Sequence, residues 1–354
     1  MELINLVNFE IVMKGKKNQK KVFIIAEAGV NHNGDLKLVK KMIDIVKDSG
    51  ADCIKFQTFK ANEFVADPNL TYTYKSQGEE VTETQLEMFK KWEFSRKQWK
   101  EIIDYCNKKG VIFATTAQNY SDLEMILSLI RPPFLKVGSD DLTNLGLLKQ
   151  YAQKGIPMVI SAGMAYEQEI GDAVVVIKKA GNKNITVLHC VSSYPAKAEE
   201  VNLRKIPAIR DKFDVKVGFS DHTIGSVAAV GAVCFGAVTI EKHFTLSHNL
   251  PGPDHWFSME PEELRKFVRD IRFAEKAMGS SELVPTANER KVSKIARRSI
   301  VAAGDIISGA KFTAVNLECK RPGTGLPPKY LPEIIGKTAK RNFKKGQLLT
   351  KKDF

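Results

Sequence analysis

The sequence has few cysteines, few aromatic residues and no long hydrophobic run. No apolar stretch approaches the roughly 20 residues that a membrane-spanning helix needs, so we expect no membrane-spanning segment. The N-terminus lacks the apolar core of a secretory signal, because polar residues interrupt it at Glu2, Asn5, Asn8 and Glu10. The five cysteines are an odd number without a CxxC pair, which argues against a disulfide framework and predicts reduced thiols in a cytoplasmic protein.

The sequence is long and carries a large positive net charge. A chain of 354 residues is longer than one ordinary domain, so we expect two domains or one large barrel with an appendage. The formal net charge of +13 suits nucleic acid, an anionic membrane or an anionic small substrate. The densest lysine cluster has no interleaved aromatic residue on which bases could stack: Lys14, Lys16, Lys17, Lys20 and Lys21. We therefore expect no nucleic-acid partner and no membrane partner.

Short apolar runs rich in Val, Ile and Phe recur eight times and predict strands. The runs are Val22–Ala26, Cys53–Phe56, Val111–Thr115, Phe134–Val137, Met158–Ile160, Thr186–Cys190, Val215–Phe219 and Val238–Ile240. Amphipathic segments with helical periodicity separate them, the weakest being Leu203–Arg210. Eight such units in about 285 residues match the size of a (β/α)8 barrel. An open doubly wound sheet is the alternative, but no GxGxxG motif follows the first run.

The alternating pattern ends after Gly279 and a different composition follows. We expect residues 1–280 to form the barrel with an N-terminal extension, and residues 281–293 to form a linker, since Ser280–Asn288 has no apolar period. Residues 294–354 combine short β-like runs with frequent glycine and proline, which predicts a small, turn-rich domain. A long insertion, Lys60–Phe94, separates the second and third predicted strands and is expected to arch over one barrel end.

Polar residues lie where each predicted strand ends. The active sites of (β/α)8 barrels lie at the C-terminal ends of the strands, so we expect these residues to share one site. In chain order they are Glu27, Lys55, Gln57, Thr116, Lys136, Ser139, Asp141, Ser161, Ser192, Tyr194, Ser220, His222 and His243.

His222 and His243 close consecutive predicted strands, so neighbouring strands would bring their imidazoles together. Two imidazoles with carboxylate or water ligands suit a divalent first-row metal such as Mn, Co or Zn. The alternative is that each histidine only hydrogen-bonds a neighbouring backbone group. The pairing at adjacent strand ends, near Glu27 and Asp254, favours the metal site.

Two lysines and several hydroxyls form a second group at the strand ends. Lys55 and Lys136, with the hydroxyls of Thr116, Ser139, Ser161 and Ser220, are the groups needed to hold a phosphate and a carboxylate together. A lysine at a strand end can also form a Schiff base, but a metal beside the lysines argues for Lewis-acid chemistry. A third interpretation pairs the lysines with Asp140, Asp141 or Glu241, which does not exclude a role in binding.

These residues stand in motifs that resemble the sialic acid synthase family. The motifs are Ala26-Glu27-Ala28-Gly29-x-Asn31-His32-Asn33-Gly34, Lys55-Phe56-Gln57-Thr58, Lys136-Val137-Gly138-Ser139, Phe219-Ser220-Asp221-His222-Thr223, Glu241-Lys242-His243-Phe244 and Pro251-Gly252-Pro253-Asp254. The tail, with Arg297-Arg298-Ser299 and Arg321-Pro322-Gly323, resembles the antifreeze-like (SAF) domain that ends those synthases. The resemblance implies a (β/α)8 TIM barrel followed by a small C-terminal β-clip domain.

The resemblance also implies a reaction, a cofactor and an assembly. Such enzymes condense phosphoenolpyruvate with an N-acylated mannosamine-type aldehyde and water, giving a nine-carbon 2-keto acid and phosphate. They use a divalent metal, usually Mn²⁺, with Mg²⁺ and Co²⁺ as alternatives. They form domain-swapped homodimers in which one chain's small domain caps its partner's site.

Roles for individual residues follow from the same resemblance. His222 and His243 would bind the metal, and phosphoenolpyruvate would be held by Lys55, Thr116, Lys136, Ser139, Ser161 and Ser220. Glu27 would stabilise developing positive charge or handle a proton, and would contact the sugar together with Gln57, Tyr194 and Asp254. Arg321 would reach the sugar's N-acyl group across the dimer.

Three features depart from the family pattern. Ser192 replaces a common asparagine, Asp141 replaces a common glutamate, and the commoner Ser-Thr-Pro run is replaced by Thr115-Thr116-Ala117-Gln118-Asn119. They leave open whether the sugar is N-acetylmannosamine, its 6-phosphate or a 2,4-diacetamido-6-deoxy sugar. Two rival functions are a metal-dependent aldolase or isomerase that does not use phosphoenolpyruvate, and an ice-binding protein. The many lysines and arginines of the tail argue against a flat ice-binding surface.

Overall fold

The computed structural model describes residues 21–354. The lysines at 14, 16, 17 and 20 and the polar N-terminal residues discussed above lie outside the described residues. Within residues 21–354, no helix has both the length and the apolar character needed to cross a membrane. The chain divides into two compact units, one ending at Gly279 and the other comprising Ser280–Phe354.

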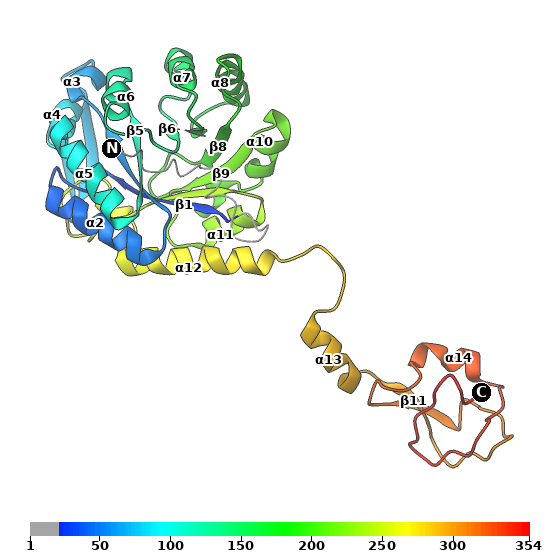
Figure 1. The fold of residues 1–354 in the computed structure, drawn as a ribbon. Helices are drawn as coiled ribbons and strands as arrows, with labels where there is room; N and C mark the ends of the chain where they lie inside the picture. The colour runs from blue at the N-terminus through cyan, green and yellow to red at the C-terminus, as the bar shows by residue number, and fades with distance from the viewer. Residues whose placement is uncertain (1–20) are drawn as a thin grey trace. The chain divides into compact units, whose positions relative to one another are not determined.

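The first unit is a closed barrel of eight parallel strands (Figure 1). The strands are β1 (Phe23–Gly29), β2 (Cys53–Thr58), β5 (Ile112–Ala117), β6 (Leu135–Val137), β7 (Met158–Ser161), β8 (Ile185–Cys190), β9 (Lys216–Asp221) and β10 (Thr239–His243). The barrel closes where β1 pairs with β10 on one side and with β2 on the other. Each predicted run overlaps one of these strands, so the predicted barrel is confirmed and the open doubly wound sheet is wrong.

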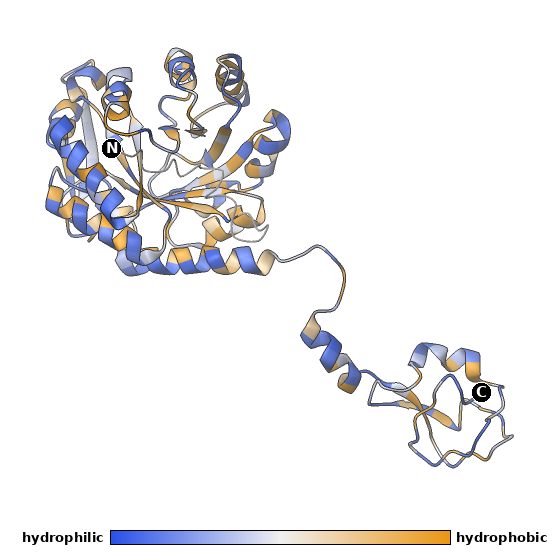
Figure 2. Cartoon of the chain, viewed as in Figure 1, coloured by the Kyte–Doolittle hydropathy of each residue, from blue (hydrophilic) through white to orange (hydrophobic). Residues whose placement is uncertain are grey.

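Helices connect the strands and cover the outside of the barrel (Figure 1). They are α2 (Leu36–Ser49), α5 (Arg96–Lys109), α6 (Tyr120–Leu127), α7 (Leu145–Ala152), α8 (Glu167–Lys179), α10 (Lys205–Phe213), α11 (Val227–Cys234) and α12 (Pro261–Met278). Hydrophobic and hydrophilic residues alternate along α12 (Figure 2), and Leu264, Phe267 and Ile271 are its buried side. The amphipathic spacing therefore places one face of each helix against the strands.

The interior of the barrel consists of an apolar layer and a polar layer. The apolar layer contains Phe23, Ile25, Cys53, Ala114, Phe134, Val159 and Leu188. Side chains along a strand alternate between its two faces, so the next inward residue lies two positions further on. From these strands those residues are Glu27, Lys55, Thr116, Lys136, Ser161 and Cys190. On each of these strands the inward-facing residue changes from apolar to mostly polar at the same height in the barrel. The C-terminal end of the barrel interior is therefore polar.

The insertion after β2 forms α3 (Ala61–Phe64), an antiparallel hairpin of β3 (Thr71–Ser76) and β4 (Glu79–Thr84), and α4 (Gln85–Lys90). The hairpin contacts the loop after β10. The backbone N–H of Gly252 donates to Ser76 Oγ at 3.1 Å, and Gln77 Nε2 donates to the Asn249 carbonyl at 2.8 Å. The insertion thus lies at the C-terminal end of the barrel, as expected for an element that arches over that end.

A network of charged side chains lies at the opposite, N-terminal end of the barrel. Asp52 Oδ1 accepts from Lys21 Nζ at 2.5 Å, and Asp52 Oδ2 accepts from the Ile24 N–H at 2.9 Å and from the Arg272 guanidinium at 2.6 Å. Arg272 also donates to the Val22 carbonyl at 2.7 Å. These bonds join the starts of β1 and β2 to α12.

The second unit contains a small sheet of two antiparallel strands, β11 (Ser299–Ala302) and β12 (Leu317–Lys320). Its core includes Ile300, Phe312, Ile334, Phe343 and Leu349. Before the sheet lies α13 (Ala287–Ala296), which begins within the expected linker 281–293 and for which no helical period was predicted from the sequence. The Thr286 side chain and Glu289 form a capping box, which starts a helix whose residues all remain exposed or half-buried.

Candidate functional site

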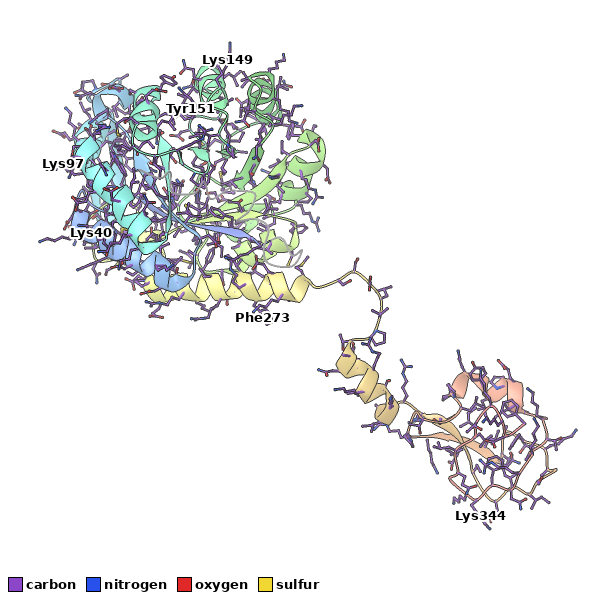
Figure 3. All side chains as sticks on the ribbon, viewed as in Figure 1. Lys40, Lys97, Lys149, Tyr151, Phe273 and Lys344 are labelled. Carbon is purple, nitrogen blue, oxygen red and sulfur yellow. The ribbon has the colours of Figure 1, made fainter. Side chains whose placement is uncertain are left out.

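The polar layer at the C-terminal end of the barrel brings most of the predicted site residues together. Contacts described below link Glu27, Lys55, Thr116, Lys136, Ser161, Ser220, His222, His243 and Asp254. In Figure 3, by contrast, Lys40, Lys97 and Lys149 project outward from the surrounding helices. The barrel therefore separates the two site lysines from the many surface lysines that give the chain its positive charge.

The centre of the site is a buried cluster of two lysines and two glutamates. Lys55 Nζ lies 2.7 Å from Glu27 Oε2 and 3.6 Å from Glu241 Oε2. Lys136 Nζ lies 3.7 Å from the other oxygen of Glu241, Oε1. All four side chains are at most 6% exposed. Two ammonium groups thus converge in a site closed to bulk water, where they interact strongly with an anion.

Hydroxyl groups surround the two ammonium groups. Lys55 Nζ donates to Thr116 Oγ1 at 3.1 Å, and Lys136 Nζ donates to Ser161 Oγ at 2.8 Å. Ser220 Oγ donates to Glu241 Oε1 at 2.8 Å. Within the described residues, Glu27 Oε1 and Glu241 Oε2 are buried and have no hydrogen-bond partner. A buried polar atom without a partner is costly, so these oxygens indicate a place where a ligand completes the hydrogen bonding.

The two glutamates have opposite protonation behaviour. Burial raises the pKa of Glu27 to about 8, because desolvation outweighs the favourable charge of Lys55. Burial also acts to raise the pKa of Glu241, but Lys136 and Lys55 overcome it and lower that pKa to about 2. Glu27 can therefore hold a proton at neutral pH, whereas Glu241 stays ionised. Carboxyl groups whose pKa values are driven apart in this way are suited to separate acid and charge-stabilising roles.

The two predicted metal-binding histidines lie side by side, with ring centroids 5.8 Å apart. The Val191 carbonyl lies 2.6 Å from His222 Nδ1 and accepts a hydrogen bond from it. The lone pair of Nε2, which lies 3.3 Å from Ser220 Oγ, is then the one that can face a ligand. His243 Nδ1 is buried without a hydrogen-bond partner among the described residues and lies 3.9 Å from Asp254 Oδ2. Burial lowers the pKa of both histidines, that of His222 to about 4, so both imidazoles are neutral and able to bind a cation.

This pair of imidazoles fits a catalytic divalent metal better than a structural one. Among residues 21–354, no group of three His, Cys, Asp or Glu side chains is placed to hold a metal ion. A structural zinc site is normally closed by four protein ligands, whereas a catalytic site leaves positions open for water and substrate. Two neutral imidazoles, one of which has a buried nitrogen without a hydrogen-bond partner among the described residues, match a catalytic site.

Gly29 shows how closely Glu27, His243 and Asp254 converge. A Cβ at this position would lie 3.5 Å from Asp254 Oδ2, 3.5 Å from Glu27 Oε1 and 3.6 Å from His243 Cε1. The backbone φ of Gly29 is +51°, which favours glycine. Asp254 itself is half-buried, and desolvation raises its pKa to about 6. The loop carrying Asp254 therefore meets the end of β1 and the histidine pair.

Further predicted residues line the edge of the site. Ser139 Oγ and Ser192 Oγ are 3.1 Å apart, and a Cβ on the intervening Gly163 would come within 2.3 Å of Ser192 Oγ, so only glycine fits there. The Tyr194 ring stacks on His222 with centroids 4.1 Å apart. Gln57 is half-buried at the end of β2 and pairs in register with Thr116. These positions surround the histidine and lysine groups.

Other residues lie apart from the buried cluster. The Asp141 carboxylate accepts a hydrogen bond from Asn144 at 3.1 Å, at the start of α7. Arg321 is exposed and belongs to the second unit. His189 is buried in β8 with Nε2 2.5 Å from the Val201 carbonyl, and His32 stacks on Phe94 with centroids 4.5 Å apart. Both of these histidines thus have structural neighbours.

The sequence analysis did not assign three residues that contribute to the site. Glu241 was considered only as an ion-pair partner, although it precedes His243 by two positions in β10 and must face the same side. The same alternation would have found Cys190, two residues after the inward Leu188 in β8. Phe257 gave no such signal. Its ring lies 5.4 Å from that of His243 and 5.0 Å from that of Tyr194.

Comparison with known proteins agrees with this arrangement. A model of the NeuB family matches residues 42–283, and a model of the SAF domain matches residues 297–354. The N,N'-diacetyllegionaminic acid synthase of Campylobacter jejuni is 42% identical over 332 residues, which cover 93% of this chain and 99% of that protein. The chain belongs to the NeuB family. The predicted family resemblance is therefore confirmed.

Two further relatives of this NeuB-family chain extend the comparison. The N,N'-diacetyllegionaminic acid synthase of Legionella pneumophila is 38% identical over 341 residues, covering 95% of this chain and 96% of that protein. The crystal structure of an N-acetylneuraminic acid synthetase from Leptospira borgpetersenii, in complex with citrate, is 33% identical with a TM-score of 0.70. That match covers 79% of this chain and 94% of the other.

Proposed function

We propose that this NeuB-family chain is a nonulosonic acid synthase. It condenses phosphoenolpyruvate with an N-acylated mannosamine-type aldehyde and water, and it releases phosphate and a nine-carbon 2-keto acid. The observation that carries the proposal is the buried Lys55–Lys136 pair beside the His222–His243 pair, at the C-terminal end of the barrel. We propose the cytoplasm as the location, since phosphoenolpyruvate is made there and the five cysteines are unpaired.

Phosphoenolpyruvate binds at the lysines. Its phosphate and carboxylate carry negative charge, and Lys55 and Lys136 supply two buried cations for them. Thr116, Ser161 and Ser220 offer hydroxyl groups at the same depth, and Ser139 adds one at the edge. Ser192, which contacts Ser139 at that edge, and Asp141, whose carboxylate contacts Asn144 apart from the cluster, are further proposed substrate-binding residues.

His222 and His243 would hold a divalent metal, for which Mn²⁺ is the expected ion and Mg²⁺ and Co²⁺ are alternatives. When bound, such an ion acts as a Lewis acid that polarises the aldehyde oxygen. The two neutral imidazoles support this assignment, and so does the carbonyl of Val191, which fixes the orientation of the His222 ring.

The two glutamates divide the proton and charge chemistry. Carbon 3 of the enol attacks the aldehyde carbon, and protonated Glu27 gives its proton to the aldehyde oxygen, which becomes a hydroxyl. Positive charge develops at carbon 2, where ionised Glu241 stabilises it. A water then adds to carbon 2, and one of its protons restores Glu27. The carbon–oxygen bond to phosphate breaks last: the remaining proton of the carbon 2 hydroxyl leaves with the phosphate, and the ketone remains.

For the sugar, we propose a 2,4-diacetamido-6-deoxy mannose-type aldehyde. The support is that two relatives with 42% and 38% identity are N,N'-diacetyllegionaminic acid synthases. Gln57, Tyr194 and Asp254 lie on the acceptor side, around Glu27 and the histidine pair. N-acetylmannosamine and its 6-phosphate are the competing acceptors in the test below.

The assembly we propose is a homodimer in which each SAF domain completes its partner's site. Arg321 would donate to the sugar's N-acyl carbonyl, and its exposure in the second unit is compatible with that contact. Arg321→Ala and His222→Ala chains, each inactive alone, should recover part of the activity when refolded together, because a mixed dimer has one intact composite site. Mixed dimers that form and stay inactive would show that the site is not shared.

One assay tests the reaction and the sugar together. The full-length protein is incubated with Mn²⁺, phosphoenolpyruvate and each of the three acceptors, and both phosphate release and product mass are measured. We expect phosphate release only with an acceptor, and the largest rate with the 2,4-diacetamido-6-deoxy sugar. Acceptor turnover without phosphate release would instead indicate a metal-dependent aldolase. His222→Ala, which is expected to be inactive, is the matched control for phosphate released by contaminating enzymes.

A further inference from the structure

A second ion pair lies directly behind the histidine pair, on the outer side of the same two strands. Lys242 Nζ in β10 lies 3.1 Å from Asp221 Oδ2 in β9, and the two residues are register partners. Lys242 is 3% exposed and Asp221 is 1% exposed. The pair faces α12, since Lys242 Nζ lies 5.8 Å from the centre of the Phe267 ring.

The same pair fixes the turn that carries His222. Asp221 Oδ1 accepts hydrogen bonds from the Thr223 backbone N–H at 2.9 Å and from Thr223 Oγ1 at 2.8 Å. Lys242 Nζ donates to the Thr223 carbonyl. Asp221 and Thr223, which flank His222, are thus hydrogen-bonded to each other. Both also contact Lys242, the residue before His243, Asp221 through an ion pair and Thr223 through a hydrogen bond.

Stability alone does not explain a pair of charges in this position. Taking two charges out of water is expensive, and a buried ion pair is often no more stabilising than apolar side chains of similar volume. Phe219 and Ile240, which are neighbouring outward residues on the same strands, are apolar and fully packed. The charged pair lies only at the level where both strands end in a histidine.

We propose that Asp221 and Lys242 are positioning residues, which set the spacing and orientation of His222 and His243 for the divalent metal. The inference rests on the proposed metal site. The ion pair and hydrogen bonds among Asp221, Thr223 and Lys242 connect the two strand ends, so the two imidazoles keep their relative placement. Because these contacts lie on the outer side of the strands, they do not occupy the inner face where ligands would bind. Partners behind metal ligands typically change metal affinity tenfold to a hundredfold when they are removed.

The test measures Mn²⁺ binding rather than turnover. The metal-free Asp221→Asn/Lys242→Met double variant removes both charges together, so neither is left buried alone. The variant is titrated with Mn²⁺, and the concentration of free Mn²⁺ is followed by its electron paramagnetic resonance signal. We expect its Kd for Mn²⁺ to rise tenfold to a hundredfold. Thr223→Val, which removes one hydroxyl donor and keeps the shape, should raise the Kd about threefold and serves if the double variant does not fold.

The matched control is the Asp52→Asn/Arg272→Met double variant at the opposite end of the barrel. It also removes an ion pair and lowers thermal stability, but its Kd for Mn²⁺ should stay within twofold of the parent protein. An unchanged Kd in folded Asp221→Asn/Lys242→Met protein, with only its Tm lowered, would overturn the positioning role and leave the proposed function intact. A parent protein that binds no Mn²⁺ would instead refute the metal assignment, and the positioning role with it.

Discussion

Both ends of the barrel contain a cluster of charged side chains, but the carboxylate oxygens are fully hydrogen-bonded in only one of these two clusters. At the N-terminal end, both oxygens of Asp52 accept hydrogen bonds, from Lys21, Arg272 and the Ile24 backbone. At the C-terminal end, Glu27 and Glu241 each keep a buried oxygen without a hydrogen-bond partner among residues 21–354. The first cluster joins elements of the fold, and the second has the unpartnered acceptors expected of a site that binds a ligand.

Depth distinguishes the two clusters as well. The side chains of Asp52 and Arg272 are 11% and 19% exposed, whereas those of Glu27, Lys55 and Lys136 are 2–4% exposed. Burying a charge becomes more expensive with depth, because less water remains to solvate it. We therefore expect the deep cluster to contribute less to stability and more to ligand binding. The following four substitutions test this contrast.

The largest effect is expected at the histidine pair. His222→Ala removes one of two imidazoles that would hold the metal, so turnover should fall by at least about 10³-fold. The circular dichroism spectrum should stay that of the folded barrel. Activity near the parent level with Mn²⁺ bound normally would contradict the metal assignment.

Glu27→Gln should lower kcat/KM by roughly 10²–10⁴-fold, because the amide cannot transfer a proton. The pH dependence gives an independent measure. Glu27 has a pKa of about 8 and holds its proton below that pH. If it acts as an acid, the kcat/KM of the parent enzyme is constant below about pH 8 and falls about tenfold per pH unit above it. A rise through pH 8 instead would identify the carboxylate as a base.

Lys136→Met should lower kcat/KM for phosphoenolpyruvate about tenfold to a hundredfold. The variant loses one charge-assisted contact, worth on the order of 1.5–3 kcal/mol. Steady-state kinetics with varied phosphoenolpyruvate measure the effect, and varied sugar at saturating phosphoenolpyruvate is the internal control. An unchanged dependence on phosphoenolpyruvate would remove Lys136 from its binding site.

The smallest effect on activity is expected at the N-terminal end. Arg272→Met breaks the bonds to Asp52 and to the Val22 carbonyl, so the free energy of unfolding should fall by about 1–3 kcal/mol. Denaturant titration measures that loss, while kcat/KM for both substrates should remain within twofold. A change in kcat/KM comparable with that of Lys136→Met would show that the two ends are not functionally separate.

The sequence predicted the barrel well because its strands are buried on both faces and read as continuous apolar runs. It held no apolar period that indicates α13, because that helix is stabilised by a capping box at Thr286 and has no buried face. The β3–β4 hairpin was also missed. Tyr72 and Tyr74 do alternate with threonines, but both strands are mostly exposed and carry no buried apolar face.

Site residues were predictable where they ended a strand and less so elsewhere. Lys55, Lys136 and the histidines follow directly from the strand positions and the family motifs. The split between the pKa values of Glu27 and Glu241 depends on distances to the lysines across the barrel, which local sequence does not contain. Phe257 reaches the histidines from a 3-10 helix beyond the last strand, so only the fold places it there.

The attachment of the β3–β4 hairpin has a consequence for mutational tolerance. Its polar bonds to the loop after β10 involve Ser76 and Gln77 at the tip, and at the loop they use the backbone of Gly252 and Asn249. Bonds to backbone place few demands on which side chains the loop carries. A change in the hairpin, or in the loop that presents Asp254, should therefore leave intact the strand register that aligns the lysines and glutamates.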